Sequence, residues 1–108
     1  MIVVITYKGR DNPNSVIFKE DGVAIPFDAA TRIVCSFYGS AVVADSDAEP
    51  GLFDWSQGGG AIEFSFNDLS VGEGTYAATL IVYDALHTDG QVLTHHTSKD
   101  LMFRFVNA

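Results

Sequence analysis

The longest apolar run with a two-residue period is Thr75-Tyr76-Ala77-Ala78-Thr79-Leu80-Ile81-Val82-Tyr83-Asp84-Ala85. Because side chains alternate between the two faces of a strand, this run predicts a β-strand from Thr75 to about Ala85. No window of about eleven residues keeps the apolar spacing of an amphipathic helix without a Gly or Pro interrupting it. The chain is therefore predicted to be all-β.

An Asp-Gly dipeptide, Asp21-Gly22, joins two apolar runs within residues 15–27. Asp-Gly tolerates positive φ at both positions of a two-residue turn, so the segment predicts a hairpin. The predicted cross-strand pairs are Glu20 with Val23, Phe18 with Ile25, and Val16 with Phe27. We expect this apolar face to point into the core, and Pro26 to mark an edge or an end of its strand.

A second Asp-Gly dipeptide, Asp89-Gly90, follows the longest strand and predicts a second hairpin. A two-residue loop there pairs Leu86 with Leu93 and Asp84 with His95. A carboxylate next to His95 is expected to raise its pKa.

Three further segments alternate between apolar and other residues: 32–38, 61–66 and 101–106. Ile62, Phe64 and Phe66 are predicted to point inward. Leu101, Phe103 and Phe105 lie on one side of their strand and Arg104 on the other, whereas Ile33, Cys35 and Phe37 alternate with Val34, Ser36 and Tyr38. The segment 32–38 is apolar on both faces, which predicts a central strand covered on both sides. Turn signals recur about every ten residues, a spacing typical of a β-sandwich.

The length and composition fit one compact domain. The chain has 108 residues, of which 47% are hydrophobic and 19% charged, so it can build a packed core. We expect one β-sandwich domain over residues 1–108.

The charge balance bears on possible partners. Fourteen acidic against six basic residues give a formal charge of -8, which argues against nucleic acid as a partner. The N-terminal run 1–8 lacks the features of a signal peptide, and no apolar segment approaches the roughly 20 residues of a membrane span. No membrane association is expected.

Residues that carry metal or nucleophile chemistry do not converge in the pattern. Cys35 lies in an apolar strand and is expected to be a core residue. Of the three histidines, only His87 and His96 share a face in the predicted hairpin, too far apart to hold one ion. We expect no metal, no cofactor and no catalytic site.

An acidic turn, Asp45-Ser46-Asp47-Ala48-Glu49-Pro50-Gly51, resembles the start of a calcium loop. Its glycine stands at the seventh position instead of the sixth, and Ser56 stands where the loop needs a bidentate Glu. The turn is therefore interpreted as solvated rather than as a calcium site.

The aromatic cluster Leu52, Phe53 and Trp55 allows two interpretations. It is a docking surface, because Trp and Phe are enriched at interface hot spots. Alternatively, it is a short added strand whose aromatic side chains close one end of the core. The sequence favours neither one.

A resemblance to known domains adds to this reading. Tyr76, which opens the longest strand after a turn, resembles the tyrosine corner of immunoglobulin-like sandwiches. Over residues 15–106, the order of turn and strand signals is similar to the N-terminal immunoglobulin-like domain of phage baseplate upper proteins. The segments that carry this similarity are Asp21-Gly22-Val23-Ala24-Ile25-Pro26, Asp28-Ala29-Ala30, Gly74-Thr75-Tyr76 and Thr88-Asp89-Gly90-Gln91-Val92.

The resemblance implies an immunoglobulin-like antiparallel β-sandwich of about 7–9 strands. It also implies a non-enzymatic structural component of a phage or prophage virion, in the tail, baseplate, neck or capsid, made in the host cytoplasm. The expected partners are other virion structural proteins and further copies of the chain. The alternative function is a carbohydrate-binding or host-recognition module in which Phe53 and Trp55 stack on sugar rings.

Overall fold

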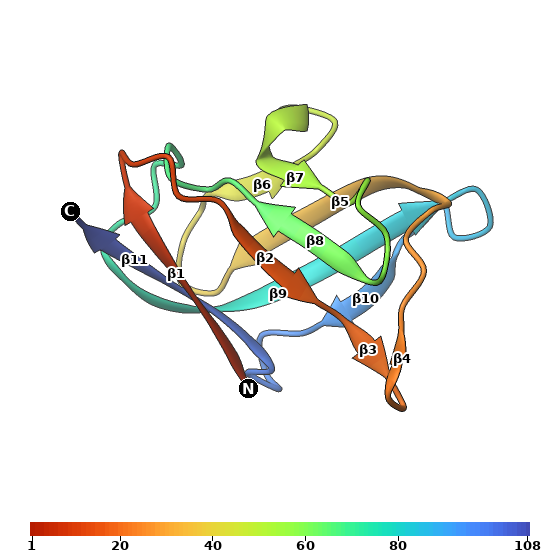
Figure 1. The fold of residues 1–108 in the computed structure, drawn as a ribbon. Coiled ribbons are helices and arrows are strands. Elements are labelled where there is room, and N and C mark those ends of the chain that lie inside the picture. The colour runs from red at the N-terminus through yellow and green to blue at the C-terminus, as the bar shows by residue number, and fades with distance from the viewer.

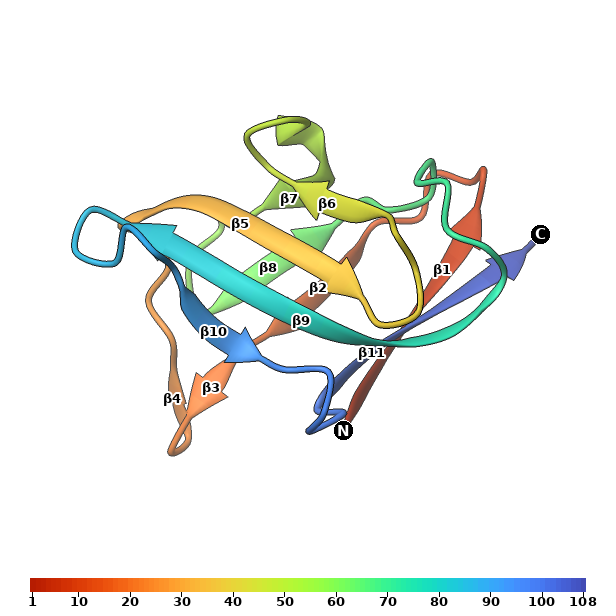
Figure 2. The ribbon, with the colours of Figure 1, turned by 180° about the vertical axis from the view of Figure 1, so that it is seen from behind.

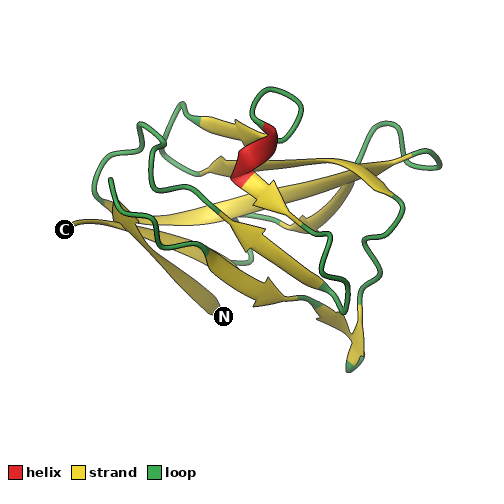
Figure 3. Cartoon of the chain, turned by 45° about the horizontal axis from the view of Figure 1, so that its top comes forward, coloured by secondary structure: helices red, strands yellow, loops and turns green.

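The computed structural model describes residues 1–108, and half of them lie in β-strands (Figure 1; Figure 3). The only helical element is a short 3-10 turn, η1 (Pro50–Leu52). This confirms the all-β prediction. The strands are β1 (Ile2–Lys8), β2 (Asn14–Ile17), β3 (Lys19–Glu20), β4 (Val23–Ala24), β5 (Ala30–Phe37), β6 (Val43–Asp45), β7 (Phe53–Asp54), β8 (Ala61–Phe64), β9 (Gly74–Asp84), β10 (Gln91–Thr94) and β11 (Leu101–Asn107).

The strands form two main sheets. The larger sheet has the order β1-β11-β9-β5-β6, with β10 as a further neighbour of β9, and the smaller has the order β2-β8-β7. The strands β3 and β4 form a separate two-stranded hairpin. The smaller sheet lies in front of β9 and β5 in Figure 1 and behind them in Figure 2, so the two sheets form two layers.

The larger sheet is mixed, which corrects the prediction of an antiparallel sandwich. β1 runs parallel to β11, from Ile2 opposite Leu101 to Lys8 opposite Asn107. The two strands come from opposite ends of the chain, so no tight turn forces them to be antiparallel. The structure has eleven strands, more than the predicted 7–9. Three of them, β3, β4 and β7, are additional short strands of only two residues each.

Phenylalanine rings fill the space between the two sheets. The core contains 19 buried hydrophobic residues, including the three predicted to point inward from 61–66 and one alternating row from each of the segments 32–38 and 101–106. At its centre, the Phe103 ring lies 5.1 to 5.5 Å from those of Phe37, Phe64 and Phe66. Cys35 is fully buried, and burial raises the pKa of its thiol. The prediction of Cys35 as a core residue is confirmed.

Tyr76 ties the start of β9 to the turn before it. Its hydroxyl donates a hydrogen bond to the carbonyl oxygen of Gly72 (2.9 Å), and its ring packs edge-on against Phe37 and Phe105. The side chain therefore fixes the path of the chain from the turn into its longest strand.

The substitution Tyr76→Phe is expected to lower the free energy of unfolding by about 1 kcal/mol, because it removes this hydrogen bond and keeps the ring. Urea denaturation followed by tryptophan fluorescence measures the change. Tyr7→Phe is the matched control, since the Tyr7 hydroxyl makes no hydrogen bond within the protein. An equal loss in both variants would show that the bond to Gly72 contributes nothing.

The first Asp-Gly hairpin forms but is shorter than predicted. Asp21 and Gly22 both have positive φ (51° and 78°), and Glu20 pairs with Val23 as expected. The ladder has only two rungs, and Val16 pairs with Ile62 of β8 instead of Phe27. Val23 is 68% exposed rather than inward-facing. The reason is that β2 buries Val16 by joining the smaller sheet, so the hairpin tip projects away from the core.

The predicted register of the second hairpin is wrong. β10 pairs Gln91 with Val82 and Val92 with Ile81, so neither Leu86 with Leu93 nor Asp84 with His95 forms a pair. The Asp84 carboxylate ends β9 by accepting hydrogen bonds from the N–H groups of Leu86 (2.9 Å) and His87 (2.8 Å). His87 also contacts this carboxylate through Nδ1, and this hydrogen bond lowers the pKa of Asp84. The predicted effect of Asp84 on His95 loses its basis.

Candidate docking surface

The larger sheet has one face turned away from the smaller sheet, and we call it the outer face. Directly paired residues on neighbouring strands lie on the same face of a sheet. The register therefore groups Val3, Ile5 and Tyr7 of β1 with Met102, Arg104 and Val106 of β11, then Thr75, Ala77, Thr79, Ile81 and Tyr83 of β9, Val92 of β10, Arg32, Val34 and Ser36 of β5, and Val43 and Asp45 of β6. Tyr38 extends this row just beyond β5.

The outer face is apolar although nothing covers it. Its most exposed hydrophobic side chains are between 41% and 68% accessible to solvent; they are Val3, Ile5, Tyr7, Tyr38, Val43 and Val92. A sheet with one solvated face normally carries polar side chains there. Exposed apolar side chains gathered on one face in this number are typical of an interaction site.

Tyr38 corrects the prediction that both faces of its strand are covered. Its side chain is 68% exposed, and its ring is stacked on that of His96, with ring centroids 4.5 Å apart and planes 9° from parallel. His96 is held in place by Thr79, whose hydroxyl oxygen accepts a hydrogen bond from the His96 N–H (3.0 Å). Together Tyr38 and His96 form a flat aromatic platform over β9.

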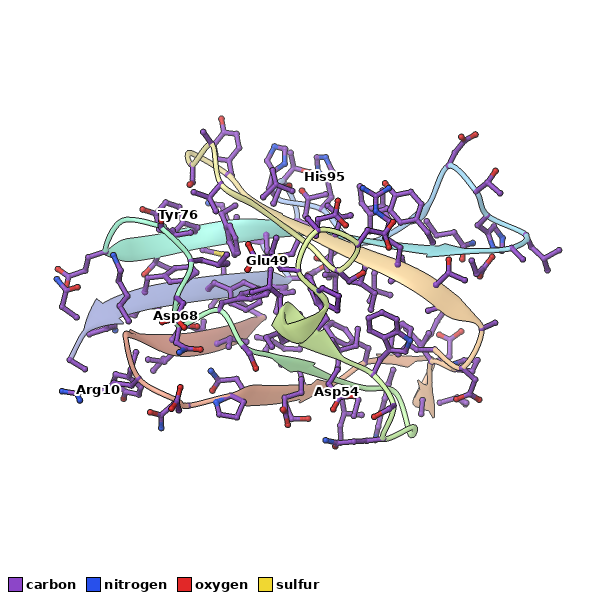
Figure 4. The ribbon with its side chains drawn as sticks, turned by 90° about the horizontal axis from the view of Figure 1, so that it is seen from above. Arg10, Glu49, Asp54, Asp68, Tyr76 and His95 are labelled. Atoms are coloured by element: carbon purple, nitrogen blue, oxygen red, sulfur yellow. The ribbon has the colours of Figure 1, made fainter.

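The platform comes from a break in the strand next to β9. β10 and β11 both pair with β9 on the same side, and residues 95–100 leave the sheet between them. This excursion carries His95 and His96, and His95 lies on the side of the larger sheet opposite Asp54 (Figure 4). The rings of His95 and His96 are 4.2 Å apart, whereas the predicted hairpin placed these two residues on opposite faces. No group of three or more His, Cys, Asp or Glu side chains comes together to hold a metal ion.

A charged network lies at the β5–β6 edge of the outer face. Arg32 contacts the Asp45 carboxylate through Nε (3.0 Å) and Nη2 (2.5 Å), and it stacks on the Tyr83 ring at 4.9 Å. The Asp47 carboxylate lies 3.5 Å from Arg32 Nε. Thus Asp45, the first residue of the turn that resembles a calcium loop, binds a guanidinium.

The network makes stability depend on pH in the acid range. The hydrogen bond from Arg32 holds the pKa of Asp45 below its ordinary value of 3.8. A carboxyl whose pKa is lowered by folding stabilises the protein above its unfolded pKa, and the benefit is lost as pH falls through the folded pKa. We therefore expect the free energy of unfolding to fall below about pH 4, and to fall less steeply in Asp45→Asn. Urea titrations between pH 3 and pH 7 measure it; parallel curves for both proteins would contradict this assignment.

The structure separates the three residues of the predicted aromatic docking cluster. Leu52 and Phe53 are 8% and 5% exposed and belong to the core, with Phe53 in β7 against Phe64 and Phe66. Only Trp55 is partly exposed, and it too packs against the core. The short-strand alternative therefore describes Phe53, because β7 pairs with β8 and turns this side chain inward, whereas Leu52 ends η1 and is buried there.

An apolar groove borders the free edge of β10. It has a volume of about 440 Å³ and lies between β10 and the segment from β2 to β4, with Ile2, Ile17, Ile25 and Leu93 among its lining residues. β10 pairs only with β9, so its other edge is open. The groove widens the exposed apolar area at the end of the outer face where Val92 lies.

Acidic residues gather away from the outer face. A hollow of about 440 Å³ is lined by Asp11, Glu49 and Asp68, between the loops that flank β2, β7 and β8. Asp54 also lies on the side of the smaller sheet (Figure 4). On the outer face itself, the strands contribute one acid, Asp45, and two bases, Arg32 and Arg104. The negative charge of the chain is therefore unevenly spread.

Comparisons with protein families, with curated proteins and with solved structures find no match for this chain. The structure contains no helix long and apolar enough to cross a membrane.

The sequence patterns did not predict the outer face, although two signals for it are present: residues 2–5 are all apolar, and residues 32–38 are apolar on both faces.

Proposed function

We propose that the chain is an immunoglobulin-like sandwich. The support is its topology: β2, β8 and β7 are arranged as strands B, E and D of that fold, and β11, β9, β5 and β6 as strands G, F, C and C′. The bond from Tyr76 to Gly72 at the start of the F-like strand corresponds to the tyrosine corner. In antibody domains the second cysteine of the disulfide stands two residues after this tyrosine. Ala78 occupies that position here, so the likeness is to the sandwich architecture and not to antibody domains.

We further propose that the protein is a non-enzymatic structural component of a phage or prophage virion and acts by protein docking. The observation that carries the docking role is the exposed apolar outer face, which a solvated sheet would not otherwise present. The link to the virion comes from the resemblance to baseplate upper proteins. The tail, baseplate, neck and capsid surface are all compatible positions, and assembly would begin in the host cytoplasm.

The charge distribution supports protein partners. Acids outside the outer face keep unassembled copies soluble, and they repel a phosphate backbone. The face left for contact is apolar and has little net charge, as the centre of a protein interface does.

Mass spectrometry of purified particles tests the virion assignment. We expect the chain in gradient-purified particles from a producing strain, at a copy number comparable to other structural proteins, and we expect its gene to lie beside portal, tail or capsid genes. Particles that are complete and infectious without the chain would overturn the proposal.

The glycan-binding alternative has its own test. Because Phe53 is buried, only Trp55 remains to stack on a sugar ring. We expect no glycan to be retained by the protein on a glycan array. Retention that is lost in Trp55→Ala would favour the alternative over the structural role.

A further inference from the structure

We propose that the outer face docks onto the outer face of a second copy of this chain, forming a two-fold symmetric dimer. The inference rests on the docking role proposed above and names its partner. Three features of the face point to a second copy: its charge, its size, and the position of the charges that are not balanced within the chain.

The charge of the chain opposes self-association through its acidic surfaces. With a formal charge of -8, two copies repel each other when their acidic surfaces approach. On the outer face, however, Arg32 and Arg104 outnumber Asp45, and Asp47 at the edge brings the balance to neutral. Two copies can therefore meet face to face without bringing like charge together.

The size of the face matches what a stable dimer needs. The strands β1, β11, β9, β5 and β6 contain 7, 7, 11, 8 and 3 residues, and at about 3.3 Å per residue and about 4.8 Å between strands they span an area of roughly 570 Å². Side chains such as Tyr38 and Val43 protrude from this plane and increase the accessible area. Full coverage thus approaches the ~800 Å² per partner of a standard interface.

The charges that are not balanced within the chain lie at opposite corners of the face. Arg104 is on β11 opposite Thr75, near the start of β9, and forms no ion pair within the chain. Asp45 is on β6, level with Ile81 near the other end of β9. Its neighbour Asp47, 66% exposed, shares Arg32 with it, so this corner has one carboxylate more than it has guanidinium groups.

A two-fold axis converts this arrangement into two ion pairs. If the axis lies in the plane of the face, at right angles to the line from Arg104 to Asp47, rotation places each Arg104 over Asp47 of the other copy. The interface is then isologous, with the same two contacts made twice. The Tyr38–His96 platform lies near the middle of the face, where aromatic anchors contribute most to binding.

Sedimentation analysis of the purified chain tests the dimer. We expect a concentration-dependent species of twice the 11.7 kDa chain mass. Tyr38→Lys and Val43→Lys each place a charge in the interface and should weaken dimerisation at least about tenfold. Val23→Lys is the matched control, since Val23 is as exposed as Tyr38 (68%) but lies at the tip of the β3–β4 hairpin, off the larger sheet, and it should leave the dimer unchanged. Circular dichroism verifies that each variant is folded.

Charge exchange tests the orientation of the two copies. Arg104→Asp and Asp47→Arg should each weaken the dimer, and the double variant should restore it. A monomeric wild-type chain, equal effects of Val23→Lys and Tyr38→Lys, or failure of the double variant to recover would overturn the proposal. A monomer in solution that is nevertheless found in particles would refute this pairing and leave the virion role intact, so the two proposals fail separately.

Discussion

Replacing Gly60 with alanine is expected to lower the free energy of unfolding by about 3 kcal/mol. Gly60 has a φ of +78°, where an L-residue costs roughly 1–2 kcal/mol. In addition, a Cβ there would lie 2.5 Å from the backbone oxygen of Phe18 and 3.2 Å from the backbone nitrogen of Ile25. Both contacts are backbone atoms at the junction of β2, β4 and β8, so they cannot rotate away from a Cβ. The Phe18 N–H also donates a hydrogen bond to the Gly60 carbonyl oxygen (2.8 Å), which holds the two segments close together.

The neighbouring glycines provide matched controls. Gly58 and Gly59 have φ values of +75° and +66°, but a Cβ at either position meets nothing within 4 Å. Gly58→Ala and Gly59→Ala should therefore lose only the conformational part, about 1 kcal/mol each. Urea denaturation of the three variants separates the two causes. Equal losses at all three positions would show that the backbone approach at Gly60 does not constrain the fold.

The segments with clean alternation could be predicted from the sequence because local pattern reports burial directly. Residues 61–66 and 101–106 place a Phe or an aliphatic side chain at every second position, and each of those side chains is buried. The longest strand, expected over 75–85, is observed as β9 (Gly74–Asp84). In these segments the local alternation of apolar and polar residues matches the burial that the folded core imposes.

The strand registers could not be predicted because they depend on contacts that the turn motif does not describe. Asp89-Gly90 suggested a tight turn, but the Asp84 carboxylate accepts hydrogen bonds from the N–H groups of Leu86 and His87 in the loop and ends β9 at Asp84. At the first hairpin, pairing with Phe27 competes with pairing to β8, and burial of Val16 in the smaller sheet prevails. Both outcomes are set by tertiary structure.

The exposure of the outer face could not be predicted from the sequence for a different reason. Apolar residues on both faces of 32–38 were interpreted as a strand between two layers of its own chain. In the structure Ile33, Cys35 and Phe37 face the core, whereas Tyr38 is exposed and Val34 is half-buried on the other side. The same pattern arises whether the second layer belongs to the same molecule or to another one, so a sequence alone does not distinguish the two.

Truncating Phe103 is expected to have the largest effect of any single substitution, a loss of about 4 kcal/mol, because large-to-small changes of buried Phe cost roughly 3–5 kcal/mol. Phe103 is fully buried on β11, and its ring lies against those of Phe37, Phe64, Phe66 and Phe105. Both sheets contribute to this cluster, so the cavity left by Phe103→Ala opens where they meet and neither sheet can close it alone.

Phe27→Ala is the matched comparison, because Phe27 is also buried but has only Phe18 as an aromatic neighbour, at 6.1 Å. Its site is flanked by the loops after β4, which can move inward, so its loss should lie near the lower end of that range, about 3 kcal/mol. Urea midpoints at an unchanged denaturant slope measure both losses. A greater loss for Phe27→Ala than for Phe103→Ala would mean that the connection around β3 and β4, rather than the aromatic layer between the sheets, holds the two sheets together. The outer face would then rest on a less rigid support than docking requires.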